Sequence, residues 1–176
     1  MCNEYSPTLA GMRQPTPAMS SRVLAVDPGY DRLGLAVVEG DPSKPVLIWS
    51  DTVLPPKGLK EARLAVVFQA VQDAIATHSP AVLALETLFF TNNQTTGIGV
   101  AEARGAVLAA AGLSQLPVLE FSPQQVKLAV TGYGNADKKA VMLMVPKLIA
   151  LTDKKRLDDE FDAIALGIAA LSTRPR

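Results

Sequence analysis

The chain has very little cysteine and no long hydrophobic segment. Cys2 is the single cysteine among 176 residues, which excludes an internal disulfide and a cysteine-based metal cluster. A reducing cytoplasm is therefore the expected location. No apolar run approaches the ~18 residues of a membrane helix, and the N-terminus lacks the basic start and apolar core of a signal peptide. We expect a cytoplasmic protein that does not enter a membrane.

An excess of either charge is also missing. The 17 lysines and arginines balance 17 aspartates and glutamates, so the formal net charge is zero. Composition alone therefore does not indicate a nucleic-acid-binding protein, and such a function must depend on local clusters of Lys and Arg. The hydrophobic content of 48% and the length suit one α/β domain with a substantial core.

The first 20 residues differ in composition from the rest of the chain. They are rich in Ser, Thr, Pro and Met and lack periodicity, so residues 1–20 are predicted to be a disordered tail and residues 21–176 the folded domain. Met12 and Met19 are alternative start positions.

Hydrophobic patterning predicts a mixed sheet. Short apolar runs predict strands and longer periodic segments predict helices; Ser122-Pro123-Gln124-Gln125 has the residues of a capping box and a helix start. Three early strands in a meander followed by alternating helices and strands imply a mixed five-stranded sheet covered by helices. The predicted strands are 23–26, 33–38, 45–53, 81–85 and 118–121, the helices 60–77, 100–111, 123–130, about 136–151 and 159–172, and 89–96 is predicted to be a polar loop.

Four carboxylates carry most of the functional information. Asp27 and Glu86 each end a buried apolar run, and Asp159 and Asp162 open the last predicted helix three residues apart, on one face. A charge at the end of a buried strand requires solvent, a partner or a cation. Acids delivered by three separate segments suggest one shared site, and such hard oxygen ligands suit Mg²⁺ or Mn²⁺ better than zinc.

Each acid by itself also has an ordinary explanation. Asp27-Pro28-Gly29 is a typical turn sequence, charged residues often end strands, and Asp158 or Asp159 can cap the last helix. Capping accounts for one of Asp159 and Asp162 but not for both. The occurrence of all four acids together, in this order, favours catalysis.

This order of acids resembles the RuvC family of Holliday junction resolvases, within the ribonuclease H-like fold, from roughly Arg22 onward. The most specific matches are Gly99-Val100-Ala101-Glu102-Ala103-Arg104-Gly105 and, between Phe121 and Val145, Gln125-Val126-Lys127, Gly132-x-Gly134, Ala136-x-Lys138 and Met144-Val145.

The resemblance implies a homodimeric endonuclease that cuts four-way DNA junctions in strands of like polarity. It implies 5′-phosphate and 3′-hydroxyl ends, two Mg²⁺ or Mn²⁺ ions per active site, and RuvA and RuvB branch-migration proteins as partners. The family's catalytic, metal-binding acids fall on Asp27, Glu86, Asp159 and Asp162, and a catalytic lysine on Lys127. The DNA-binding positions implied are Phe89, Asn93, Arg104, Lys127 and Lys138.

The turn after Asp27 departs from the family pattern. The family usually follows Asp-Pro-Gly with a small hydroxyl residue and then an arginine, whereas this chain has Tyr30, Asp31 and then Arg32. The DNA contact of the family's arginine is therefore not carried over to Arg32, while the four acids are unaffected.

Phe89, the Ala-rich helix and the function each have an alternative interpretation. Phe89 is expected to be a wedge that opens the junction, but either Phe89 or Phe90 can be a core residue. The Ala-rich helix 100–111 is expected at the dimer interface, or else buried on its own sheet. The competing functions are a sugar or acetate kinase, which needs a duplicated domain and a second Gly-rich loop absent from this chain, and a junction-binding protein without activity, which the four intact acids argue against.

Overall fold

The computed structural model describes residues 22–88 and 94–173, so the predicted tail and Phe89, Phe90 and Asn93 lie outside the described residues. Along the chain the elements are β1 (Val23–Pro28), β2 (Leu33–Asp41), β3 (Lys44–Val53), α1 (Lys60–His78), β4 (Val82–Glu86), α2 (Gln94–Leu113), β5 (Val118–Phe121), α3 (Pro123–Thr131), α4 (Lys138–Leu148) and α5 (Asp158–Ser172). No helix in this part of the chain is long and apolar enough to cross a membrane.

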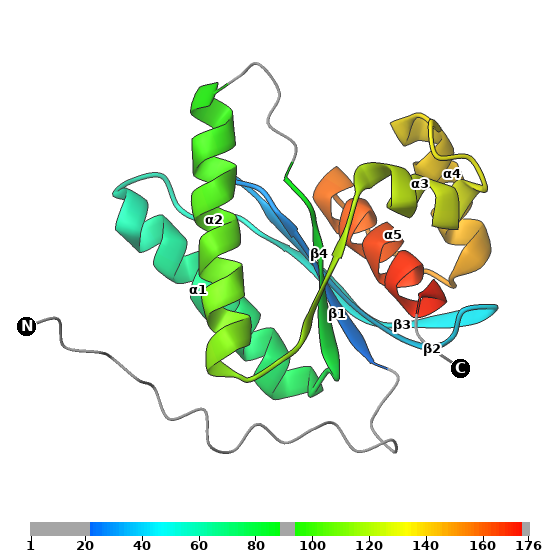
Figure 1. Cartoon of the computed structure of the whole chain (residues 1–176), viewed down its shortest axis with the longest axis horizontal. Helices are drawn as coiled ribbons and strands as arrows, with labels where there is room; N and C mark the ends of the chain where they lie inside the picture. Colours follow the sequence, from blue (N-terminus) through cyan, green and yellow to red (C-terminus); the bar gives the residue numbers. More distant parts are fainter. Residues whose placement is uncertain (1–21, 89–93, 174–176) are drawn as a thin grey trace, which may run out of the picture.

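The five strands form one mixed sheet in the order β3-β2-β1-β4-β5. Strands β1, β2 and β3 make an antiparallel meander, while β4 and β5 run parallel to β1. The mixed five-stranded sheet predicted from the sequence is confirmed, with β1 at its centre (Figure 1).

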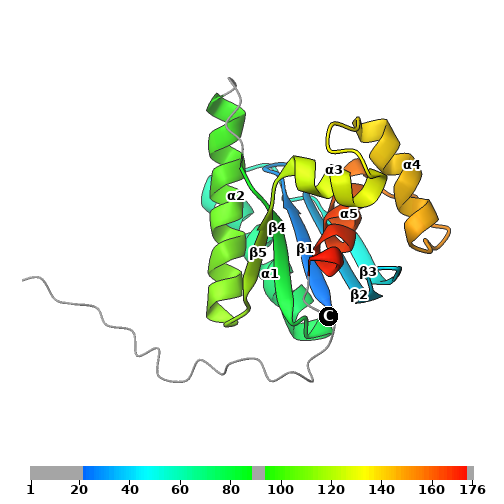
Figure 2. The ribbon, with the colours of Figure 1, turned by 45° about the vertical axis from the view of Figure 1, so that its right-hand side comes forward.

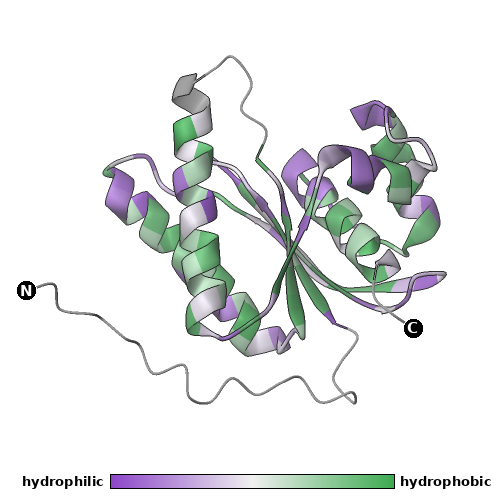
Figure 3. Ribbon diagram, in the orientation of Figure 1, coloured by the Kyte–Doolittle hydropathy of each residue, from purple (hydrophilic) through white to green (hydrophobic). Residues whose placement is uncertain are grey.

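Helices cover both faces of this sheet. Helices α1 and α2 lie on one face, and α3, α4 and α5 on the other (Figures 1 and 2). The central strands are largely hydrophobic, while polar residues are found on parts of α1, α3 and α4 (Figure 3). The molecule therefore has two apolar cores, one on each side of the sheet.

Alternation along the strands decides which side each residue faces. In β1, Leu24 and Val26 belong to the core under α1 and α2, whereas Val23 and Ala25 belong to the core under α5. The next residue of the second set is Asp27, so its side chain falls on the α5 side. The same alternation through β4 places Glu86 on that side as well.

The largest difference from the predicted elements is the start of α2. This helix begins at Gln94, six residues before the predicted start at 100. The run Gln94-Thr95-Thr96-Gly97 contains weak helix formers and reads as loop by propensity, but it continues the helix that packs on α1 and the sheet. Residues 94–96 of the predicted polar loop are therefore helical.

Candidate active site

Strands β1 and β4 bring the first two acids side by side. They pair in parallel with Val26 opposite Leu85, so the next residues along the two strands are Asp27 and Glu86. Both side chains fall on the α5 side by the alternation described above. Two segments separated by almost 60 residues thus deliver carboxylates to one end of the sheet.

Helix α5 brings the other two acids to the same end. Its first turn contains Asp158, Asp159 and Glu160. A Cβ placed on Gly34 would lie 2.0 Å from the carbonyl oxygen of Asp159 and 3.3 Å from Cβ of Asp27. Gly34 also pairs directly with Asp27 in the β1–β2 ladder. The missing side chain at residue 34 therefore lets the start of α5 approach the strand that carries Asp27.

The capping explanation for the acids of α5 is wrong. The N-cap residue is Leu157, and no side chain caps the helix. Asp158 and Asp159 lie inside the helix, so neither accepts the hydrogen bonds of a cap.

Two lysines reach the acids from well-capped helices. Helix α3 begins with the predicted capping box between Ser122 and Gln125, which confirms that expectation and places Lys127 one turn further on. Asp137 caps α4 by accepting a hydrogen bond from the backbone N–H of Ala140, so Lys138 opens that helix. Its ammonium donates to Oδ2 of Asp162 at 3.0 Å.

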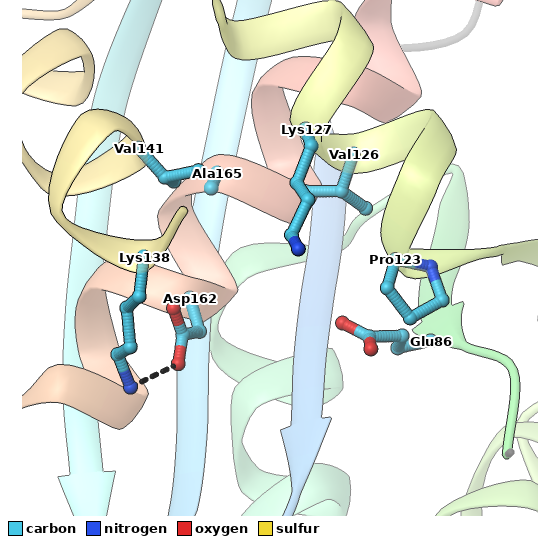
Figure 4. Close-up of a pocket in the computed structure, with 8 residues that line it drawn as sticks. All are labelled: Glu86, Pro123, Val126, Lys127, Lys138, Val141, Asp162 and Ala165. Carbon is cyan, nitrogen blue, oxygen red and sulfur yellow. Dashed lines mark hydrogen bonds and ion pairs between the residues drawn. The ribbon is translucent and has the colours of Figure 1, made fainter. Parts of the chain in front are cut away.

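A pocket of about 170 Å³ collects these groups. Lys127 extends into it between Asp162 and Glu86 (Figure 4). One part of the wall is charged and the other apolar, so a charged ligand bound here meets few competing waters on the apolar side. The lining residues are Glu86, Lys127, Lys138 and Asp162, with Pro123, Val126, Val141 and Ala165.

Side-chain cations partly neutralise the acids. Besides Asp162, Lys138 approaches Asp158 at 3.5 Å, and Nη1 of Arg32 lies 3.4 Å from Oδ2 of Asp159. In residues 22–88 and 94–173, no three Asp, Glu, His or Cys side chains are gathered into a set that could hold a metal ion. The acids converge on one place without forming a closed coordination sphere.

The carboxylates nonetheless affect one another strongly. The pKa of Asp27 is raised from 3.8 to about 7, mainly by burial and then by the charges of Asp162, Glu86 and Asp159, against the lowering effect of Lys138. Burial and the charge of Asp162 also raise the pKa of Glu86, against the opposing effect of Lys127. Burial raises the pKa of Asp162 too, despite its bond to Lys138. All four predicted acids therefore share one electrostatic environment.

Arg104 stabilises the end of the strand that carries Glu86. Its buried guanidinium donates to the backbone carbonyl of Glu86 at 2.6 Å and pairs with the carboxylate of Glu120 at 2.8 Å. It thereby ties the end of β4 to β5 next to one of the acids. The DNA contact expected of Arg104 stays a prediction, and it would compete with these two interactions.

The unusual turn after Asp27 is held by a contact that sequence reasoning did not find. Arg63 of α1 donates to the carbonyl of Tyr30 at 2.8 Å and to Asp31 at 2.7 Å, and its guanidinium lies 4.4 Å from the centre of the Tyr30 ring. The ring packs on Gly99 of α2, where an added Cβ would come within 2.7 Å. Tyr30 and Asp31 thus anchor the turn to both helices of the opposite face.

Residues 23–170 match the family described as "Crossover junction endodeoxyribonuclease RuvC". The chain belongs to the RuvC family. A RuvC relative from Carboxydothermus hydrogenoformans is 38% identical over 148 residues, which are 84% of this chain and 94% of the relative. Family membership makes the protein a DNA endonuclease and implies dependence on a divalent metal.

Solved RuvC structures agree with the fold. The structure titled "T. thermophilus RuvC in complex with Holliday junction substrate" superposes with a TM-score of 0.81 at 32% identity, covering 88% of this chain and 95% of that one. The yeast mitochondrial Holliday junction resolvase superposes with a TM-score of 0.63 at 13% identity, covering 86% of this chain and 79% of that one, and supports the fold alone. The predicted ribonuclease H-like fold is thereby confirmed.

Proposed function

We propose that Asp27, Glu86, Asp159 and Asp162 hold divalent cations with which this RuvC-family protein cuts four-way DNA junctions. The observation that carries this proposal is the convergence of acids from β1, β4 and α5 on one end of the sheet, where each raises the pKa of Asp27. Structural ion pairs lower carboxylate pKa values, whereas crowded acids raise them and need a cation to be stable when ionised.

The donor set fits Mg²⁺ or Mn²⁺. Every candidate ligand is a carboxylate, and small hard cations prefer oxygen ligands. The ion pair between Lys138 and Asp162 shows that this carboxylate already accepts a positive charge. Two cations per active site is the family expectation, and four acids supply enough ligands for them.

Divalent cations, when bound here, supply an activated water and stabilise charge on the leaving 3′-oxygen. The residues of this chain place the scissile phosphate. Lys127 lies beside Glu86 in the pocket, where its ammonium stabilises negative charge on the phosphate, and Lys138 at the start of α4 binds the adjoining DNA backbone. The products are a 5′-phosphate and a 3′-hydroxyl.

The apolar walls of the pocket strengthen these interactions. Pro123, Val126, Val141 and Ala165 surround the charged groups on one side. Fewer waters then compete for the phosphate, so the attraction of Lys127 is screened less than on an open surface. This arrangement suits a site that binds the negatively charged DNA backbone and hydrolyses a phosphodiester bond there.

A cleavage assay on a synthetic four-way junction tests the proposal. With Mg²⁺ or Mn²⁺ we expect paired nicks in two strands of like polarity, and no cleavage when a chelator is added. The same sequences as linear duplexes are the matched control. Binding of the junction without cleavage in either metal would show a junction-binding protein without activity, and the proposed function would then be wrong.

Paired cleavage requires a two-fold dimer, because a four-way junction has approximate two-fold symmetry. The outer face of α2 supports such a dimer. Gly105 and Gly112 lie seven residues apart there with no neighbouring atom within 4 Å of an added Cβ, beside Ile98 and Leu113, which are 57% and 75% exposed. Small residues allow another helix to approach closely, and the exposed apolar side chains favour burial.

Helix α2 also packs on its own sheet, so both expectations for this helix have structural support. Val107 and Ala110 are fully buried in the core under α1 and α2.

The dimer is tested by analytical ultracentrifugation at micromolar concentration. Leu113→Glu should shift the protein toward monomer, while Leu54→Glu, at a comparably exposed apolar residue outside α2, should not. A wild-type monomer with full paired cleavage would contradict the dimer.

The remaining expectations extend the proposal to residues and partners outside the described structure. Phe89, three residues after Glu86, is the proposed wedge at the junction, and Asn93 is a proposed DNA contact. Phe89→Ala should reduce junction cleavage and the unstacking reported by a fluorescent base analogue at the crossover. If Phe90→Ala has this effect instead, the wedge is Phe90. RuvA and RuvB are the proposed partners, and the cytoplasm, where the DNA lies, is the proposed location.

A further inference from the structure

A buried ionic cluster lies next to the acids of α5. Glu160 is only 2% exposed. Its Oε1 accepts a hydrogen bond of 2.6 Å from Oγ of Ser50 in β3 and one of 3.2 Å from Nζ of Lys154. The guanidinium Nε of Arg156 makes an ion pair with the same oxygen at 3.2 Å. One buried carboxylate oxygen thus joins β3, the segment before α5, and α5 itself.

The cations of this cluster are held by further bonds. Lys154 also donates to the backbone carbonyl of Ser50 at 2.9 Å. Arg156 donates to the carbonyl and the hydroxyl of Thr152 at 2.8 and 2.9 Å, and its side chain is 4% exposed. In the basic stretch Lys154-Lys155-Arg156, Lys154 and Arg156 are therefore both turned toward Glu160.

The first turn of α5 needs such an anchor. Its N-cap residue Leu157 offers no side-chain hydrogen bond, and an uncapped first turn leaves backbone N–H groups without partners and frays easily. Yet Asp159 lies in this turn and Asp162 directly after it. The close approach of Gly34 in β2 to the carbonyl of Asp159 tolerates little displacement, and Glu160 ties the same turn to Ser50 in the neighbouring strand β3.

We propose that Glu160 is a positioning residue, whose buried carboxylate, held by Ser50, Lys154 and Arg156, fixes the first turn of α5 so that Asp159 and Asp162 face Asp27. The inference deepens the proposed function and rests on it. Neighbouring groups that orient metal ligands without touching the metal have large effects on affinity. Glu160 acts in this way through the helix backbone, one residue from Asp159 and two from Asp162.

The experiment compares Glu160→Gln with a matched control. Glu160→Gln keeps the size of the side chain and removes its charge. Glu39→Gln removes the charge from a partly buried ion pair on the same sheet, Arg22 with Glu39 at 2.8 Å, at the opposite end of β2 from Gly34. For both full-length variants, Mn²⁺ affinity is measured by calorimetry without DNA, and kcat, junction affinity and thermal stability are measured alongside.

We expect Glu160→Gln to lower Mn²⁺ affinity and kcat by roughly 10-fold or more, with junction affinity unchanged. Glu39→Gln should lower thermal stability only. If Glu160→Gln, measured well below its unfolding temperature, matches Glu39→Gln in Mn²⁺ affinity and kcat, the cluster is purely structural and the inference is wrong. Should Glu160→Gln not fold, Ser50→Ala removes only the 2.6 Å hydrogen bond, and unchanged Mn²⁺ affinity in that variant would overturn the inference.

Asp27→Asn separates this inference from the proposed function. If Asp27→Asn loses Mn²⁺ affinity and Glu160→Gln does not, the metal site stands and the positioning role falls. If Asp27→Asn binds Mn²⁺ as the wild type does, the proposed metal site falls, and the role of Glu160 falls with it.

Discussion

The two faces of the sheet are packed in different ways. Under α1 and α2 the strands contribute large side chains such as Leu24, Leu35 and Leu85. Under α5 they contribute small ones, among them Ala25, Ala36 and Ala84. On this second face an added Cβ at Gly167 of α5 would come within 2.6 Å of Val38, so α5 lies unusually close to the strands.

The large side chains on one face mainly stabilise the fold, whereas the small side chains on the other mainly set the position of α5. Large buried side chains remove much apolar area from water and stabilise the fold over a broad surface. Small side chains bury less area but let a helix approach closely, which fixes its distance from the sheet. The site lies at the end of the close-packed face, where the acids of α5 must meet those of β1 and β4. Damage to the two faces should therefore have different consequences.

The largest expected effect is the loss of cleavage in Asp27→Asn. Asp27 lies on the central strand and is influenced by the three other acids, so its removal should disrupt the whole cation site and reduce junction cleavage by several orders of magnitude. Junction binding in the absence of metal should remain. Glu86→Gln should behave similarly. Cleavage near the wild-type rate in either variant would contradict the assignment of these acids.

The next effect is a difference between two variants, Gly34→Ala on the face covered by α5 and Val71→Ala on the face covered by α1 and α2. The added methyl group at residue 34 meets the backbone of Asp159, so α5 must move and kcat should fall at least tenfold, with a stability loss of about 1–3 kcal/mol. Truncation of Val71, a residue of α1 that is fully buried against the sheet, should lower the stability by about 2 kcal/mol. Well below the unfolding temperature, the kcat of Val71→Ala should equal that of the wild type.

Urea unfolding and single-turnover cleavage measure the two quantities. Equal losses of kcat in Gly34→Ala and Val71→Ala, at matched stability, would mean that the two faces do not differ in the way the packing indicates.

A smaller effect concerns binding through local positive charge. Changing Lys127 and Lys138 together to Ala should reduce the slope of log affinity against log salt by about 2, because each phosphate contact contributes roughly 0.9. Lys44→Ala, at the far end of the β2–β3 hairpin, is the control and should leave the slope unchanged. Filter binding or fluorescence anisotropy over a range of salt concentrations checks this. A wild-type affinity that does not depend on salt would rule out binding led by phosphate contacts.

The smallest expected effect is on stability against pH in the metal-free protein. The folded-state pKa of Asp27, about 7, lies above its ordinary value of 3.8, so ionisation of this group weakens the folded state. Stability that Asp27 contributes below about pH 4 is lost as the pH rises through 7. Asp27→Asn should therefore be more stable than the wild type at pH 8, and this difference should shrink at pH 4.

Thermal unfolding in a chelator at pH 4 and pH 8 provides the measurement. A stability difference between Asp27→Asn and wild type that is the same at both pH values would show that Asp27 titrates at its ordinary pKa.

Local patterns were sufficient for the strands, because strands depend on neighbouring residues and on the alternation of side chains. The four acids were chosen by their order along the chain and by the family resemblance, and their catalytic role stays a prediction. The capping box at Ser122 was also visible, since it spans only four positions. The contacts that position the acids could not be predicted from local patterns. Ser50 and Glu160 are 110 residues apart, and the need for glycine at residue 34 arises only when α5 packs against β2. Nothing in a window of sequence distinguishes Glu160 from an exposed helical glutamate.

The contact between Tyr30, Arg63 and Gly99 limits how this chain can be recombined with its relatives. The ring of Tyr30 occupies the space left by Gly99, and the guanidinium of Arg63 covers the ring and holds the following aspartate. A chimaera that receives the β1–β2 turn of a relative, with a small hydroxyl residue in place of the ring, leaves a void at Gly99 and a buried arginine without its carboxylate. These three positions should therefore be exchanged as one unit, although they are carried by a turn and two separate helices.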